Sequence, residues 1–153
     1  MHKLKILMLL IFMASLSACF ETTTYNSTTK SSNKYNFGKF LDSITSFPYS
    51  APAEQQERIK NNYTKLKIGM PKNEILNILP PPNAEFFTYE KNGDKEVFES
   101  SSWAYYLTRQ EYNLGSDSDA ALFLYFNELE QLYWSIPDNI EGLSQLGNPL
   151  DAR

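Results

Sequence analysis

Cys19 is the only cysteine in a chain of 153 residues, and its thiol is the one group whose chemistry the surrounding sequence indicates. The residues just before it, Leu16-Ser17-Ala18, are mostly small and suit a cleavage point. Lys3 and Lys5 supply positive charge near the start, and an apolar run over residues 6–13 follows them. This is the layout of an export signal. The apolar run is well short of the ~20 residues that a membrane-spanning helix needs, so we expect no transmembrane anchor.

The tetrapeptide Leu16-Ser17-Ala18-Cys19 resembles the lipobox of bacterial lipoproteins. That resemblance implies cleavage before Cys19, a diacylglyceryl group on its thiol and an acyl chain such as palmitate on the new N-terminus. Each buried methylene adds about 0.8 kcal/mol of membrane affinity, so several chains would anchor the protein to a bilayer. Phe20 stands where such proteins carry aspartate when they are retained in the inner membrane, which favours the outer membrane. The alternative is an ordinary signal peptide in which a free cysteine happens to follow Ala18.

Cleavage would also remove the only histidine, His2. Catalysis by Ser/His/Asp or Cys/His sets needs an imidazole, and zinc sites draw mainly on histidine and cysteine. We therefore expect a protein that is not an enzyme, with no catalytic residues, no metal site and no cofactor other than the lipid on Cys19. A carboxylate-dependent envelope hydrolase stays open only if two acids face each other across a cleft, ~5 to 9 Å apart. Asp117-Ser118-Asp119 has too few ligands for calcium and predicts a solvated turn.

The charge balance bears on the partners. Two of the 14 basic residues lie in the signal, so the mature chain would carry 18 acidic against 12 basic residues, a formal charge near −6. A nucleic-acid partner needs a basic face that displaces counterions, and we expect none. Anionic lipid heads are equally unsuited to this charge, so contact with the bilayer would depend on the acyl chains.

The elements behind Cys19 indicate one domain with a leader. Residues 1–18 are the predicted signal peptide, and residues 19–50 are predicted to be a largely flexible tether, because residues 21–36 are almost all Thr, Ser, Asn, Tyr and Lys. Within it, the apolar spacing of residues 37–47 permits a short helix or a loop that packs on the domain. The domain itself is predicted over residues 51–136, and residues 137–153 form a C-terminal tail.

Two helices are expected at the start of the domain. The first begins near Pro52 and buries Ile59, Tyr63 and Leu66 along one stripe. The second begins at Pro71 and is stopped by the three prolines that follow Leu79. Its predicted buried residues are Ile75, Leu76, Ile78 and Leu79.

Strands follow the prolines. Residues 86–89 and 97–98 flank Asn92-Gly93, a strong hairpin signal. A further strand is predicted over residues 103–107, and residues 120–126 and 131–136 are expected to form a closing hairpin. Two helices followed by an antiparallel meander predict an α+β fold, with the helices packed on one face of a small sheet.

Residues 59–136 resemble the SmpA/OmlA (BamE-like) domain of outer-membrane lipoproteins. The resemblance is carried by a Gly-Met pair before the second helix, a leucine and a proline that close it, a tryptophan and a terminal hairpin: Gly69, Met70, Leu79, Pro82, Trp103 and Phe126. It implies helices on one face of a sheet and a role in an envelope complex, with the machinery that folds outer-membrane β-barrels as the first candidate. Pro71, Pro80 and Glu130 differ from the family's usual residues, which are a capping hydroxyl and two glycines.

The closing hairpin also suggests a binding face. Alternation along it predicts that Leu122, Leu124, Phe126, Leu132, Trp134 and Ile136 face the core. The opposite set predicts an aromatic strip for a protein partner: Tyr106, Phe123, Tyr125 and Tyr133. Alternatively, residues 37–49 or the C-terminal tail cover this strip.

Two classes of function remain at this point. The first is a scaffold or accessory subunit of an outer-membrane complex, with its domain assumed to face the periplasm. The second is a periplasmic inhibitor or ligand-binding lipoprotein of the β-lactamase-inhibitor-like type, which would bind one soluble enzyme tightly.

Overall fold

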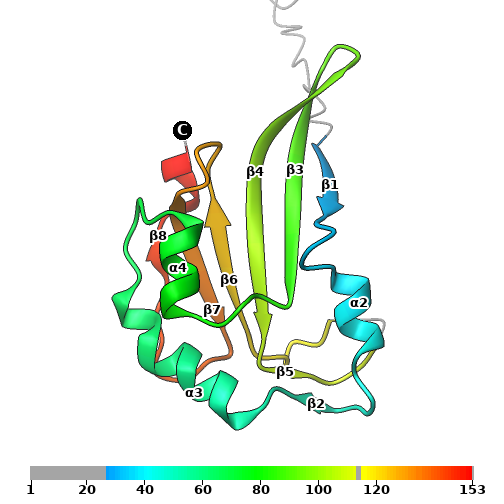
Figure 1. Ribbon diagram of the computed structural model, residues 1–153, viewed down its shortest axis with the longest axis vertical. Coiled ribbons are helices and arrows are strands. Elements are labelled where there is room, and N and C mark those ends of the chain that lie inside the picture. Colours follow the sequence, from blue (N-terminus) through cyan, green and yellow to red (C-terminus); the bar gives the residue numbers. More distant parts are fainter. Residues whose placement is uncertain (1–26, 113–114, 153) are drawn as a thin grey trace, which may run out of the picture.

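The computed structural model describes residues 27–112 and 115–152. The predicted lipid site Cys19 and the residues Leu16, Ser17 and Ala18 lie outside this part of the chain. The fold is α+β, as predicted, with a six-stranded antiparallel sheet and a few short helices (Figure 1). None of the helices in the described ranges has the length and apolar character needed to cross a bilayer.

The large sheet has the strand order β1-β3-β4-β6-β7-β8. From β3 onward each strand pairs with the next one in this series, so these five strands form a meander. Their bounds are β1 Ser27–Ser31, β3 Ala84–Asn92, β4 Lys95–Tyr106, β6 Ala121–Phe126, β7 Leu132–Asp138 and β8 Leu146–Gly147. Two short strands, β2 Tyr49–Ser50 and β5 Thr108–Arg109, pair separately.

The β3–β4 hairpin turns at the predicted Asn-Gly position and extends beyond the rest of the sheet (Figure 1). The two predicted segments at residues 97–98 and 103–107 belong to one strand, β4. A register shift lies between them, where Tyr89 pairs with Phe98 but Thr88 pairs with Ser100. The extra residue explains why the sequence pattern looked like two strands, since a bulge interrupts the alternation.

Helices α3 (Ala53–Asn62) and α4 (Lys72–Ile78), with the 3-10 turn η1 (Tyr63–Lys65), lie on one face of the sheet, which we call the inner face (Figure 1). The predicted buried positions Ile59, Tyr63, Leu66, Ile75 and Leu79 are all in the core, and Leu76 and Ile78 pack against it. Burying each large aliphatic side chain contributes roughly 1.5–3 kcal/mol. On the sheet side the same core contains Trp103, Tyr105, Leu107, Leu122, Leu124, Phe126, Leu132 and Ile140.

The Gly-Met pair joins the loop before α4 to the last hairpin. Gly69 has a φ of 84°, which favours glycine, and its N–H donates to the carbonyl oxygen of Leu132 at 2.7 Å. The N–H of Leu132 donates in turn to the carbonyl oxygen of Met70 at 2.9 Å. At the other end of α4, Leu79 is extended, with φ −101° and ψ 159°. Pro80 therefore follows a helix that ends without the left-handed turn for which glycine is used.

The structure differs from the predicted tether, because residues 27–50 are folded against the sheet. β1 pairs with β3 over five residues, and the N–H of Ser32 donates to the carbonyl oxygen of Glu85 at 2.7 Å. Helix α2 (Phe37–Asp42) follows and is capped by the Asn36 side chain. An edge strand is held by its backbone hydrogen bonds and needs little apolar surface, so its polar composition did not indicate it.

The predicted C-terminal tail, residues 137–153, also contains regular structure. Strand β7 continues to Asp138, and β8 then pairs with β7. A 3-10 turn, η2 (Pro149–Ala152), ends the described chain. The domain therefore includes residues on both sides of the predicted 51–136 boundaries.

Candidate functional site

The register of the closing hairpin decides which side chains share a face. Tyr125 pairs with Trp134, but the next residue, Phe126, pairs with Leu132, so Tyr133 is an extra residue in β7. One extra residue moves all later side chains of a strand to the other face. Ser135 is consequently buried on the inner side, with its Oγ 2.7 Å from the Tyr63 hydroxyl.

The prediction that Trp134 and Ile136 face the core is therefore wrong. Both lie on the outer face, opposite the α3–α4 layer, where Trp134 pairs with Tyr125 and Ile136 pairs with Phe123. The Tyr125 and Trp134 rings are stacked, with centroids 4.5 Å apart and planes 23° apart. The predicted aromatic strip thus contains an indole that alternation alone had assigned to the core.

The four residues of the predicted binding face are in different surroundings. Tyr106, Phe123 and Tyr125 share the outer face, and the Tyr106 and Phe123 rings are 6.2 Å apart. Tyr133, the extra residue of the bulge, has no partner in the β6–β7 register. Burial raises the pKa of the hydroxyl of each tyrosine among them.

Helix α2 covers the Tyr106 side of the outer face. The Phe40 ring stacks on Tyr106 at 5.3 Å and 9°, and Phe37 contacts Tyr106 at 5.5 Å and Phe86 at 5.9 Å. Tyr106 is left with 8% of its surface exposed. The alternative that residues 37–49 cover the strip is thus confirmed for Tyr106.

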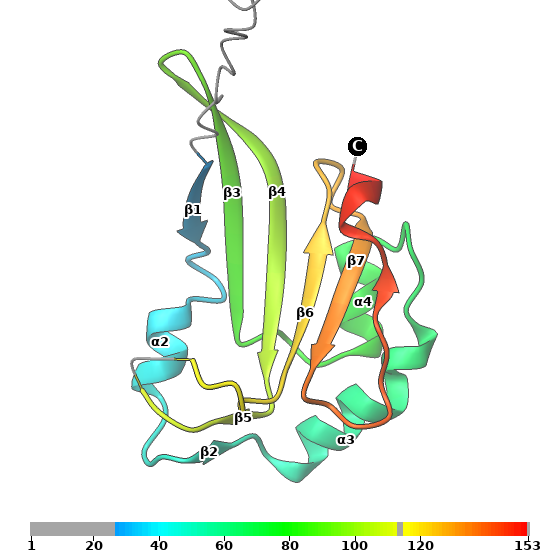
Figure 2. The same ribbon diagram turned by 180° about the vertical axis from the view of Figure 1, so that it is seen from behind.

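The other side of the outer face, over β6 and β7, is not covered by α2, α3 or α4 (Figure 2), and the 3-10 turn η2 contacts β7. We call this surface the outer patch, and it consists of Phe123, Tyr125, Trp134 and Ile136. Each of the four is partly exposed. The stacking of Tyr125 on Trp134 holds two of these large side chains in fixed positions.

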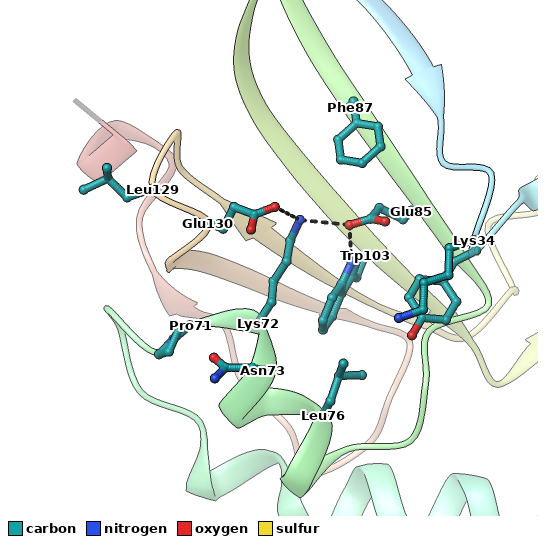
Figure 3. A pocket seen from close by; sticks show the side chains of 11 residues that line it. Lys34, Pro71, Lys72, Asn73, Leu76, Glu85, Phe87, Trp103, Leu129 and Glu130 are labelled. Atoms are coloured by element: carbon teal, nitrogen blue, oxygen red, sulfur yellow. Dashed lines mark hydrogen bonds and ion pairs between the residues drawn. The ribbon is translucent and has the colours of Figure 1, made fainter.

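A second candidate site lies on the inner face. A cleft of about 440 Å³ opens between the first turn of α4, the β6–β7 turn, the sheet and the segment after β1 (Figure 3). It is lined by Lys34, Tyr35, Pro71, Lys72, Asn73, Leu76, Glu85, Phe87, Trp103, Leu129 and Glu130. Of these residues, the sequence analysis named Pro71, Leu76, Trp103 and Glu130 for structural reasons, and it singled out none of the other charged residues.

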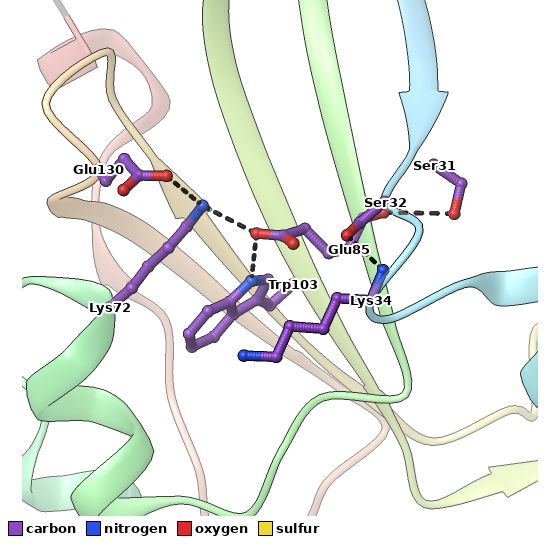
Figure 4. Close-up of polar contacts among 7 residues, drawn as sticks. All are labelled: Ser31, Ser32, Lys34, Lys72, Glu85, Trp103 and Glu130. Carbon is purple, nitrogen blue, oxygen red and sulfur yellow. Dashed lines mark hydrogen bonds and ion pairs between the residues drawn. The ribbon is translucent and has the colours of Figure 1, made fainter.

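Lys72 is at the centre of the polar contacts in this cleft (Figure 4). Its Nζ donates to Glu85 Oε1 at 2.8 Å and to Glu130 Oε1 at 3.0 Å. Trp103 Nε1 donates to the same Glu85 oxygen at 2.8 Å. The side chains of Lys72 and Glu85 are 11% and 10% exposed, whereas that of Glu130 is 60% exposed. Lys72 therefore has one buried and one exposed carboxylate partner.

The electrostatics keep Glu85 ionised. Burial alone would raise the pKa of its carboxyl, but hydrogen bonds from Lys72 and Trp103 and the positive charge of Lys72 lower it below its ordinary value. The Lys72 ammonium also lies over three rings, with 5.5 Å to Phe87, 5.6 Å to Trp103 and 5.2 Å to Phe126. These contacts compensate part of the cost of burying both charges.

The arrangement of the two carboxylates differs from the acid–base pair of a glycosidase. Both bind the ammonium of Lys72, and a general acid needs a raised pKa, whereas that of Glu85 is lowered. Within residues 27–112 and 115–152, no group of three or more His, Cys, Asp or Glu side chains could hold a metal ion.

The residues of the family motif have structural positions. Trp103 and Phe126 meet edge to face at 4.9 Å, Leu79 and Pro82 are buried, and Gly69 and Met70 bind the start of β7. Comparisons with family models, with characterised proteins and with solved structures found no match to this chain. The BamE-like resemblance therefore stays a prediction.

Proposed function

We propose that the protein is a non-enzymatic lipoprotein, anchored in the outer membrane through an acylated Cys19, whose domain faces the periplasm and binds a protein partner. It would act as a scaffold or accessory subunit of an envelope complex, and by resemblance the first candidate is the machinery that assembles outer-membrane β-barrels. The lipobox supports the anchor, and the packing of α3 and α4 on one face of a meander agrees with the domain that the resemblance implies.

The outer patch is the observation that carries this proposal. Four large side chains stand together on adjacent strands and stay partly exposed, and Tyr125 and Trp134 are stacked. Tyrosine and tryptophan are typical of protein interfaces because they bury a large rigid area at low entropic cost. An aromatic surface of this kind on a folded sheet suits a partner protein better than a small polar ligand.

Crosslinking in intact cells tests the partner. A photoreactive amino acid at position 125 is compared with the same group at Glu57, an exposed position on α3 on the other side of the sheet. We expect position 125 to crosslink barrel-assembly components and position 57 not to do so. Consistent recovery of a different complex would remove the barrel-assembly assignment, and no crosslink at position 125 would remove the outer patch as the interface.

Metabolic labelling tests the anchor independently. Radiolabelled palmitate should be incorporated into the wild-type chain and found with it in the outer-membrane fraction. The Cys19→Ser variant should lose the label and should no longer be found in the outer-membrane fraction. A wild-type protein that is processed but carries no label would instead support the ordinary signal peptide.

The cleft favours a second candidate, a periplasmic inhibitor or ligand-binding lipoprotein. Its volume of about 440 Å³ lies within the usual range of small-ligand sites, roughly 300–1,000 Å³. An inhibitor would copurify with one soluble enzyme, whereas the scaffold would copurify with membrane components. Affinity purification of the wild-type chain distinguishes these two outcomes.

A further inference from the structure

Glu130 is an exposed partner of Lys72 in a strained turn. Its φ is 58°, in the left-handed region that disfavours residues other than glycine. The turn itself is held by Asn127, whose Oδ1 accepts hydrogen bonds from the N–H groups of Leu129 and Gln131. An ion pair with an exposed partner contributes little to stability, so the contact between Glu130 and Lys72 is weak enough to be exchanged.

Glu85 is the fixed partner of the same ammonium. It lies within the sheet next to Trp103, and both of its backbone groups are bonded: its N–H donates to the carbonyl oxygen of Tyr35 and its carbonyl oxygen accepts from Ser32, each at 2.7 Å. A ligand that reached Lys72 would therefore displace Glu130 and leave Glu85 in place.

Lys34 adds a second cation on the opposite side of the cleft. Its side chain extends toward Trp103 (Figure 4), and its Nζ lies 4.9 Å from the centre of the Tyr35 ring. In the described part of the chain it forms an ion pair with no carboxylate. Without Glu130, the charges that line the cleft are Lys34, Lys72 and Glu85, a net charge of +1.

Apolar groups surround these charges. Phe87 and Leu76 line the cleft from the sheet and from α4, and Leu129, which is 69% exposed, lies at its edge on the β6–β7 turn. A cleft with one net positive charge beside apolar walls is complementary to a monovalent anion with an apolar body. A dianion would place excess negative charge near the buried Glu85, and a cationic ligand would meet Lys34.

We propose that this cleft binds a small organic carboxylate. The carboxylate group replaces Glu130 on the Lys72 ammonium and also pairs with Lys34, while its aryl or alkyl body lies against Phe87, Leu76 and Leu129. The two lysines and the exchangeable Glu130 make the cleft prefer an anion. The apolar walls make it prefer a ligand with an apolar body. The site is on the inner face, so it does not depend on the partner protein proposed for the outer patch.

The test uses the two tryptophans of the chain as reporters. The full lipoprotein, labelled with 5-fluorotryptophan and inserted into lipid nanodiscs, is titrated with 3-phenylpropionate and followed by ¹⁹F NMR. Trp103 lines the cleft, whereas Trp134 lies on the outer face and is the internal control. We expect a saturable shift of the Trp103 resonance, no shift of Trp134, and at least fivefold weaker binding of the neutral analogue 3-phenylpropionamide.

Three variants with exposed substitutions keep the test independent of folding. Lys34→Gln should weaken binding of 3-phenylpropionate about fivefold, Glu130→Gln should strengthen it severalfold by removing the competing carboxylate, and Lys60→Gln on α3 should leave it unchanged. The proposal would be overturned if the acid and the amide bound equally, if both tryptophan resonances shifted, or if no shift were saturable. It would also be overturned if the affinity for 3-phenylpropionate were unchanged in both Lys34→Gln and Glu130→Gln. Crosslinking through position 125 is unaffected by Lys34→Gln if the two sites are separate.

Discussion

The two faces of the large sheet differ in how their side chains are covered. On the inner face, the side chains of β4 and β6 are almost fully buried under α3 and α4, as Tyr105, Leu122 and Leu124 are. On the outer face, the centre is lined with small residues, Ala84, Ala104 and Ala121, over which the rings of α2 pack. Helices α2, α3 and α4 do not cover the outer patch beside them (Figure 2). The side chains of the inner face thus stabilise the fold, whereas the partly exposed side chains of the outer patch are explained better by binding to a partner.

Neighbouring residues show the contrast most clearly. Leu124 is 0% exposed, and Tyr125, the next residue on β6, is partly exposed and stacked on Trp134. The inner face also contains a buried ion pair, Lys72 with Glu85, whereas the outer patch has only aromatic and aliphatic side chains. Substitutions on the inner face should therefore mainly lower stability, whereas substitutions in the outer patch should mainly weaken binding of the partner.

The largest loss of stability is expected from Lys72→Met. It leaves the Glu85 carboxylate buried without its cation, and breaking a buried pair in this way costs about 3–5 kcal/mol. Urea denaturation of the variant measures this loss, with the exposed Lys60→Met on α3 as the control, for which we expect a change within ~0.5 kcal/mol. Equal stabilities of the two variants would show that the Lys72–Glu85 pair does not hold the inner face together.

Phe40→Ala should have the next largest effect. It removes the ring that stacks on Tyr106 and contacts Tyr49, and truncating a half-buried phenylalanine costs about 1–3 kcal/mol, less than in a full core. Hydrogen exchange should show faster exchange of β4 amides near Tyr106, while the α3–α4 layer is unchanged. Lys39→Ala on the same helix is the matched control. Uniform destabilisation of both layers would mean that α2 is not a separate cover of the outer face.

Lowering the pH should weaken the inner face through Glu85. Its pKa is lower in the folded chain than the ordinary value of 4.5, so its contribution is fully present above that pH and is lost as the pH falls through the folded pKa. Glu85→Gln should cost about 1–3 kcal/mol near neutral pH, because the amide oxygen still accepts hydrogen bonds from Lys72 and Trp103 but no longer carries the charge that balances Lys72. The difference between wild type and variant should shrink on acidification. A constant difference at all pH values would contradict the assignment to this carboxylate.

The smallest effect is expected in the β6–β7 turn. Glu130→Gly relieves the left-handed strain and Glu130→Gln does not, while both remove the exposed pair with Lys72. Because the relief is partly offset by the backbone entropy of glycine, we expect Glu130→Gly to be more stable than Glu130→Gln by about 0.5–1 kcal/mol. Thermal denaturation of the two variants measures this. A more stable Glu130→Gln would show that the turn is not strained at this position.

The sequence predicted the elements whose signals are local. The Asn-Gly turn, the stripe of Ile59 and Tyr63 and the prolines after Leu79 each depend on a few neighbouring residues, and the structure confirms the elements they indicate. The closing hairpin and the core-facing side chains of β6 and of Leu132 were predicted correctly. The faces of Trp134 and Ile136 were not, because the one-residue bulge at Tyr133 has no local signature and reverses the alternation after it.

The cleft could not be predicted from local patterns. Glu85 and Glu130 lie 13 and 58 positions after Lys72 in the sequence. Only the packing of α4 and of the β6–β7 turn against the sheet brings the three side chains together. One signal was available: Glu85 is a charged residue between apolar neighbours at the start of a strand, and a buried charge of this kind needs a partner. Lys34 gave no comparable signal, since it lies in a polar segment that resembled a tether.

The double variant Tyr125→Ser/Trp134→Ser tests the central claim most directly, since it removes the stacked pair of the outer patch. Its stability is measured by thermal denaturation. A photoreactive group at position 136, placed in both the double variant and the otherwise wild-type chain, is crosslinked in intact cells, and the bound partner is recovered by affinity purification. If the patch is a binding surface, the variant should lose about 1–2 kcal/mol or less, and the crosslinked partner should be lost. A large loss of thermal stability with the partner still recovered would show that these rings serve the fold and do not bind the partner.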